Sequence, residues 1–178
     1  MAKWLADPAH SEVHFKVRHL VISTVTGSFK KFDCEVESDK EDFTDATIRF
    51  SADTDSVDTT QEQRDTHLKS ADFFDTANFP KLTFTSTQFI KKSGSDYLLK
   101  GDLTIRGTTR SIDLNVEYGG TAVDPYGQKK AGFEVTGKIN RNDFGLKWSA
   151  LTEAGGVVVG DEVKLIINIQ VIQQGVTV

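Results

Sequence analysis

Apolar and polar residues alternate one by one through most of the chain, which is typical of β-strands with one buried face. Turn-forming residues separate several of the alternating segments, as at Ser93–Asp96 and Asp124–Gly127. Alternation is clearest in eight segments, over residues 13–17, 32–36, 46–50, 82–86, 99–105, 112–118, 133–139 and 162–172. The pattern therefore predicts eight strands, each with an apolar and a polar face.

A polar outer face on nearly every predicted strand places the apolar faces against one shared core. Such a sheet closes on itself as a barrel or folds into a sandwich. An eight-stranded barrel is filled by its own side chains or holds one small ligand, and alternation alone does not choose between the two. No repeat or linker divides the sequence, so we predict a single all-β domain over residues 1–178.

Residues 60–73 interrupt the alternation and favour a short helix, followed by an irregular segment up to Pro80. Glutamine, glutamate, arginine, leucine and lysine are frequent here, and all of them have good helix propensity. We expect this segment to lie near one opening of the barrel. The apolar side chains that would cover that end are Leu68, Phe73, Phe74 and Phe79.

Phenylalanine is unusually frequent, with 12 residues against 3 tyrosines and 2 tryptophans. Phenylalanine has bulk without a polar atom, so it suits the wall of an apolar space. We predict that this space is lined by the apolar strand faces, with one histidine at its mouth and one phenylalanine from the helical segment. These residues are Phe15, Val17, His19, Phe32, Ile48, Phe50, Phe74, Phe84, Leu103, Ile105, Leu114, Phe133, Val135, Leu165 and Ile167.

Charge and composition exclude several classes of partner. The net charge is -5, with acidic and basic residues interspersed, which argues against nucleic-acid binding and against a polybasic membrane patch. No stretch approaches the ~20 apolar residues that span a bilayer, so we expect no stable membrane insertion. The N-terminus has no apolar run of signal-peptide length. We expect a cytoplasmic protein, or a periplasmic or secreted one if a leader has been removed.

Candidate reactive residues are present, but none of them forms a recognisable site. His10 and His14 lie four residues apart, and on a strand that spacing is ~13 Å, too far to share one metal. Cys34 is the only cysteine and lies on an apolar strand face, as a packed structural thiol does. We therefore expect no catalytic residue, no metal site and no cofactor.

Seven motif blocks follow one another along most of the chain. They are Trp4, Asp7 and Pro8 with His10–His19, then Gly27–Phe32, Asp65–Asp75, Phe79–Ser86, Gly101–Thr109, Ile139–Leu146 and Val159–Val163. In this order the blocks resemble the YceI-like family of polyisoprenoid-binding, lipocalin-like barrels. The blocks are mostly structural and do not identify a ligand head group.

The resemblance implies an eight-stranded antiparallel lipocalin-like barrel with an elongated apolar pocket for an isoprenoid lipid. The ligand would be of the quinone or polyprenyl phosphate type, bound or carried without chemistry, and a homodimer stays open. One alternative is a stress-related protein with a filled barrel that binds a partner through its surface. Another is an isoprenoid-modifying enzyme that uses His19, His67 or Asp65 as acid or base.

Overall fold

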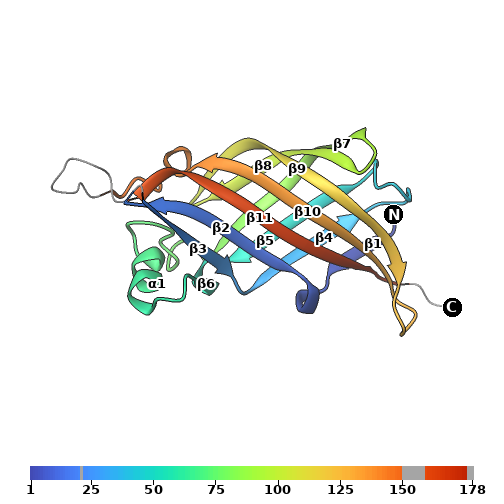
Figure 1. Ribbon diagram of the computed structural model, residues 1–178, viewed down its shortest axis with the longest axis horizontal. Helices are drawn as coiled ribbons and strands as arrows, with labels where there is room; N and C mark the ends of the chain where they lie inside the picture. Colours follow the sequence, from blue (N-terminus) through green and yellow to red (C-terminus); the bar gives the residue numbers. More distant parts are fainter. Residues whose placement is uncertain (21, 150–158, 176–178) are drawn as a thin grey trace.

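Antiparallel strand pairing runs continuously around the molecule in the computed structural model, which describes residues 1–20, 22–149 and 159–175 (Figure 1). The strands are β1 (Lys3–Ala6), β2 (Glu12–His19), β3 (Ser23–Phe29), β4 (Phe32–Glu37), β5 (Thr47–Asp53), β6 (Val57–Asp58), β7 (Lys81–Ser93), β8 (Asp96–Ile105), β9 (Thr108–Val123), β10 (Lys129–Asn140) and β11 (Val159–Gln173). The helices are η1 (Pro8–His10), η2 (Thr54–Ser56), α1 (Glu62–Lys69) and η3 (Arg141–Phe144).

Eight strands close the barrel, in the order β1-β4-β5-β7-β8-β9-β10-β11, and β11 pairs back onto β1. The closing contact is made at Trp4, which pairs with Val36 of β4 on one side and Gln173 of β11 on the other. The predicted all-β, eight-stranded antiparallel barrel with one short helix is therefore confirmed.

The first two strands of the barrel are each broken into two parts. η1 separates β1 from β2, and both parts pair with β11. β3 runs on into β4, and of this pair only β4 was predicted, because Ser23–Gly27 is mostly small or polar on both faces. β3 pairs with β2, while on its other edge only Ser28 and Phe29 pair, with β6. Among the described residues, Ser23–Gly27 thus leaves one strand edge unpaired.

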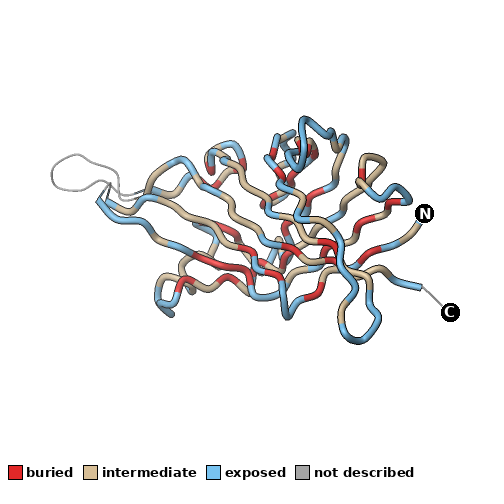
Figure 2. Tube along the Cα trace, turned by 45° about the vertical axis from the view of Figure 1, so that its right-hand side comes forward, coloured by how far each residue is buried: buried red, intermediate tan, exposed pale blue. Residues whose placement is uncertain are grey.

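Burial alternates along the barrel strands, with buried and more exposed segments interleaved (Figure 2). In β8, every second residue from Tyr97 to Ile105 is buried. Two phenylalanines of the inner face lie over glycines of neighbouring strands, Phe15 over Gly27 and Phe84 over Gly101. A side chain at either glycine would overlap the aromatic ring, so these glycines leave room for the rings beside the wall.

One end of the barrel is where β1 begins and β11 ends (Figure 1). The loop over residues 38–46 inserts Phe43 into this end, where Phe43 is only 1% exposed. Its ring packs edge-on against Trp4, Tyr118 and Phe133 at centroid distances of 5.1, 5.4 and 5.2 Å. The loop is held in place because the Tyr97 hydroxyl donates to the Asp42 carbonyl at 2.6 Å.

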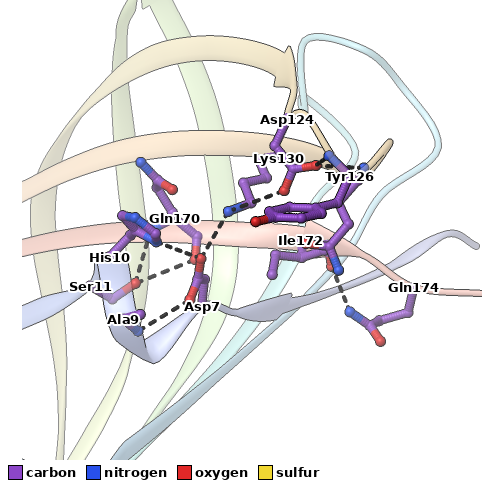
Figure 3. A network of polar contacts seen from close by, with 11 residues as sticks. Asp7, Ala9, His10, Ser11, Asp124, Tyr126, Lys130, Gln170, Ile172 and Gln174 are labelled. Atoms are coloured by element: carbon purple, nitrogen blue, oxygen red, sulfur yellow. Dashed lines mark hydrogen bonds and ion pairs between the residues drawn. The ribbon is translucent and has the colours of Figure 1, made fainter.

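A polar network fixes η1 against β10 and β11 (Figure 3). The Asp7 carboxylate accepts from Lys130 Nζ at 3.0 Å and from the Ala9 amide at 3.1 Å, and it lies 2.8 Å from His10 Nδ1. Lys130 Nζ also lies 3.5 Å from the carboxylate of Asp124 in the β9–β10 turn. Burial alone raises the pKa of Asp7, but the bonds from His10, Lys130 and Ala9 together hold that pKa below its ordinary value.

The opposite end of the barrel is covered by the segment that contains α1 (Figure 1). Phe73 and Phe74, which follow α1, are buried, and Phe74 packs edge-on against Phe29 at 5.6 Å. Phe79 does not join them: its ring lies against Gly107 at the β8–β9 turn. This turn lies at the same end of the barrel, because Arg106 donates to the Phe73 carbonyl at 3.2 Å, so coverage of the end by Phe79 stays a prediction.

Candidate functional site

A cavity of about 550 Å³ occupies the barrel below α1, a size typical of small-ligand pockets. The predicted lining residues come together here, with the exception of Phe32 and Phe133. Those that line the cavity are Phe15, Val17, His19, Ile48, Phe50, Phe74, Phe84, Leu103, Ile105, Leu114, Val135, Leu165 and Ile167. That they bind a ligand stays a prediction.

Phe32 and Phe133 lie elsewhere in the barrel. Phe32 stacks on Phe50 at a centroid distance of 6.3 Å and does not line the cavity. Phe133 lies deeper, stacked on Tyr118 at 5.1 Å and in contact with Phe43, so it belongs to the closed end. Both were predicted as cavity lining from their strand face, but the face of a residue does not determine its depth along the barrel axis.

A second, much smaller space of about 50 Å³ lies between the main cavity and the closed end. Phe43, Phe89 and Phe133 form part of its wall. Five residues line both spaces and therefore form the partition between them: Cys34, Ile48, Leu99, Val135 and Ile169. The apolar interior thus ends in a narrow chamber with an aromatic floor.

The main cavity is elongated along the barrel. Every second residue of β11 from Val163 to Ile169 lines it, and six residues of strand correspond to about 20 Å. Val159 lines the cavity still closer to α1. This length suits an extended chain better than a compact ligand.

Polar side chains that line the cavity lie at the end near α1, except for His14, which is level with Ile166 of β11. They are His14, Arg18, His19, Thr59, Gln61, Gln63, Arg64, His67 and Arg141. Among the residues that the structure describes, no aspartate or glutamate lines the cavity. We call this set the polar rim. Below it, the wall is apolar apart from Cys34.

Arg141 and Trp148 were not predicted as site residues, although both line the rim. Arg141 is 4% exposed, and its guanidinium donates to the carbonyls of Leu146, Trp148 and Gly160. These bonds hold η3 and its following residues against the start of β11. In the sequence, only the motif block Ile139–Leu146 pointed to Arg141. Its partners are backbone carbonyls, which every residue has, so they leave no pattern in the sequence.

The three residues considered for acid–base chemistry lie in different surroundings. The Asp65 carboxylate accepts from the amide of Thr59 at 2.8 Å and from its hydroxyl, so it secures the start of α1 and does not line the cavity. His67 Nε2 lies 2.8 Å from an Asp72 carboxylate oxygen, and its ring packs edge-on against Trp148 at 4.6 Å. His19 ends β2 at the rim.

Cys34 lies in the partition between the two spaces, and its thiol is buried. Burial, and to a lesser degree the Glu35 carboxylate, raises the pKa of Cys34 to about 12. The reactive thiolate form is therefore scarce at neutral pH. Within the described residues there is also no group of three or more histidine, cysteine, aspartate or glutamate side chains that could hold a metal ion.

Comparison with known proteins identifies the family. A YceI-like domain matches residues 4–171, which is nearly the whole chain. The chain belongs to the YceI-like family. A UPF0312 protein of Staphylococcus aureus (strain MSSA476) is 41% identical over 165 residues, which cover 92% of this chain and 94% of the relative. A UPF0312 protein of Staphylococcus epidermidis (strain ATCC 12228) is 39% identical over the same length.

Solved structures of similar fold include other YceI-like barrels. The Campylobacter jejuni YCEI protein is 31% identical with a TM-score of 0.75, covering 89% of this chain and 90% of that one. Burkholderia cenocepacia BcnA has a TM-score of 0.81 at 22% identity, covering 93% and 98%. A polyisoprenoid binding domain from Saccharophagus degradans has a TM-score of 0.72 at 17% identity, covering 97% and 99%, and shows the shared fold.

Proposed function

We propose that this YceI-like protein binds and carries an isoprenoid lipid of the quinone or polyprenyl phosphate type, without chemically changing it. The observation that supports this most strongly is the elongated apolar cavity of about 550 Å³, with an aromatic floor at one end and a polar rim at the other. The structural neighbour from Saccharophagus degradans is described as a polyisoprenoid binding domain, which agrees with such a ligand.

The apolar wall is sufficient to hold a long tail. Each buried CH₂ group contributes about 0.8 kcal/mol of transfer free energy, so several isoprene units bind tightly without any specific polar contact. The cavity accepts the tail lengthwise, with the head group left at the rim. No helix of the described residues is long and apolar enough to cross a membrane.

Binding without chemistry agrees with the distribution of reactive groups. The tail would contact side chains that are apolar except for Cys34, whose thiol stays protonated at neutral pH. Asp65 does not suit the acid–base alternative, because its carboxylate accepts hydrogen bonds from Thr59 and does not line the cavity. The filled-barrel alternative conflicts with the volume of the cavity.

Organic extraction of the purified protein, followed by mass spectrometry, tests the proposal directly. We expect a co-purified polyprenyl compound, or uptake of added geranylgeraniol or menaquinone-4 in a stoichiometric titration. Repeated failure both to find and to load a lipid would overturn the function. Recovery of a chemically altered lipid after incubation would instead favour the enzyme.

A pair of adjacent substitutions tests the binding face. Leu165→Asp places a carboxylate in the cavity wall, whereas Lys164→Asp places the same group on the exposed face of the same strand. We expect Leu165→Asp to abolish loading of geranylgeraniol and Lys164→Asp to leave it unchanged, with the circular dichroism spectrum of each variant as the check on folding. Equal loading by both variants would show that β11 does not line the lipid site.

A further inference from the structure

The connection between β2 and β3 lacks the residues that usually make a tight turn. It consists of residues 20–22, a leucine, a valine and an isoleucine, of which the structure describes Leu20 and Ile22. The side chain of Ile22 is 85% exposed and that of Leu20 is 39% exposed. Turns at a protein surface are normally built from glycine, proline, asparagine and aspartate. An apolar run at such a place breaks the pattern of a water-exposed surface, which indicates a function there.

Three other hairpin turns follow the usual pattern. The β7–β8, β8–β9 and β9–β10 turns each have a glycine with positive φ, namely Gly94 at 54°, Gly107 at 73° and Gly127 at 81°. In the β2–β3 connection Leu20 occupies this region, with a φ of 55°. Leucine is strained there because its Cβ approaches the following carbonyl oxygen. Phe43 also has a positive φ, but its ring is buried in the floor, whereas Leu20 stays exposed.

The β2–β3 turn lies beside the mouth of the cavity. β2 ends and β3 begins at the end of the barrel where α1 lies (Figure 1). His19, which precedes the turn, lines the cavity, and so do Val17 and Val25, which pair with each other across the hairpin. Ile22 is three residues from Val25, which corresponds to about 10 Å along a strand. A surface that contacts the turn is therefore next to the cavity.

The charges around the turn favour contact with a lipid surface. Residues 13–32 contain four lysines and arginines but no aspartate or glutamate, although the chain has 26 acidic residues. On the adjacent β11, Asp161 lies 3.6 Å from the Arg141 guanidinium, and Glu162 lies 3.5 Å from Lys138 Nζ. Attraction to anionic lipids adds to the burial of apolar area when a protein binds a bilayer. The hairpin can thus approach an anionic or zwitterionic surface without presenting a carboxylate of its own.

The size of the exposed apolar area distinguishes a bilayer from a protein partner. Leu20 and Ile22 together present far less than the ~800 Å² per partner that a stable protein interface buries. A bilayer takes up single apolar side chains without a complementary shape, and the gain is proportional to the area buried. Two side chains on a narrow turn therefore suit a bilayer better than a second protein chain.

We infer that Leu20 and Ile22 dock the protein on a lipid bilayer, with the mouth of the cavity next to the membrane surface. The contact is shallow and reversible, because only two side chains enter the boundary between head groups and acyl chains. Docking itself does not depend on a bound lipid. Its role in exchange rests on the proposed carrier function, since an isoprenoid lipid then enters and leaves the cavity without crossing water.

Vesicle flotation with the full, unloaded chain tests the docking. The vesicles contain phosphatidylcholine alone or phosphatidylcholine mixed with phosphatidylglycerol, and binding should be tighter to the mixture because the hairpin is basic. Ile22→Asp should weaken binding at least about tenfold, the loss of one buried aliphatic side chain. Val123→Asp is the matched control: Val123 is 66% exposed at the opposite end of the barrel, so this variant should bind as the parent does.

Tryptophan emission reports whether the turn enters the bilayer. Tryptophan favours the membrane interface, so the Ile22→Trp variant should bind vesicles at least as tightly as the parent. Its emission should shift to shorter wavelength when vesicles are added, whereas the Val123→Trp variant should show no shift. A shift in neither variant, or an equal shift in both, would overturn the assignment of the turn.

Equal vesicle binding by the parent and Ile22→Asp would overturn the docking, as would absence of binding to both kinds of vesicle. Sedimentation without vesicles tests the other occupant. A dimer of the parent that Ile22→Asp dissociates would make the turn a contact between two copies of the chain and overturn the bilayer.

Loading and delivery of geranylgeraniol separate docking from the carrier function. Ile22→Asp should load the lipid normally, because Ile22 does not line the cavity, but it should deliver the lipid to vesicles more slowly than the parent and Val123→Asp do. An unchanged rate of delivery would overturn the role in exchange. Failure of the parent to load any lipid would overturn the proposed function and leave the docking standing.

Discussion

The two ends of the barrel are each covered by a connection between strands, but the connections work in opposite ways. The loop over residues 38–46 inserts Phe43 into the barrel. The hydroxyls of Tyr97 and Tyr118 hold the backbone of this loop in place. The helix α1 at the other end has no fully buried residue and presents donors to the cavity.

The difference shows what separates a floor from a mouth in this barrel. A floor needs an apolar side chain that fills the axis, together with hydrogen bonds that satisfy the backbone of the inserted loop. At the mouth, the apolar residues after α1 line the space without filling it, and polar groups remain at the rim. Within the described part of the chain, Phe43 thus fills one end of the interior and the polar rim lies at the other.

The largest expected effect is that of Phe43→Ala. Its removal enlarges the enclosed space of about 50 Å³ that Phe43 already lines, so we expect the free energy of unfolding in urea to fall by about 3–5 kcal/mol. Phe74→Ala at the mouth is the matched control. It adjoins an existing cavity and creates no new one, so it should cost only the lost transfer free energy, about 1.5–3 kcal/mol. Equal losses would show that the two ends do not differ in packing.

A smaller effect is expected for Asp7→Asn in the network near the closed end. The folded-state pKa of Asp7 is lowered, so the carboxylate stabilises the fold above its unfolded pKa of about 3.9, and this stability is lost as the pH falls through the folded value. Asp7→Asn should therefore cost about 2 kcal/mol at pH 7, and its difference from the parent should disappear in strong acid. Unfolding is measured across pH, with the exposed Asp96→Asn as control; a constant difference would contradict this account.

The smallest effect is expected for Tyr97→Phe, which removes the hydroxyl that anchors the floor loop. The lost bond to the Asp42 carbonyl is worth about 1 kcal/mol. Tyr126→Phe removes the same hydroxyl from a side chain that is 90% exposed and should leave the unfolding free energy unchanged. If Tyr97→Phe also leaves the unfolding free energy unchanged, packing of Phe43 and the Tyr118 bond to the Glu41 carbonyl suffice to hold the floor.

Alternation predicted most strands of the barrel, because a strand with one apolar inner face must alternate apolar and polar residues. It did not predict β3, whose residues Ser23–Gly27 are mostly small or polar on both faces, and this is the strand with an unpaired edge. Alternation also assigned Phe133 to the cavity wall, whereas Phe133 lies beside Phe43 near the closed end. The pattern predicts which face a residue lies on, but not its depth along the barrel axis.

The floor and the rim were harder to predict than the wall. Phe43 lies in a loop without any period, and its partners Trp4, Tyr118 and Phe133 are distant in sequence. Arg64 lies on a helix whose orientation toward the barrel depends on the bonds to Thr59. His19 lines the cavity at the end of β2, a position that follows from where the strand itself ends.

The pairing of Trp4 with Gln173 also has a consequence for how the protein is made. The ring of strands closes between residues near the two ends of this chain, so its folding depends on contacts of very high sequence separation. At about 5–20 residues per second, a ribosome needs on the order of ten seconds to produce the stretch between β1 and β11. Until β11 is made the ring of strands cannot close, so the enclosed cavity comes into existence only with that strand.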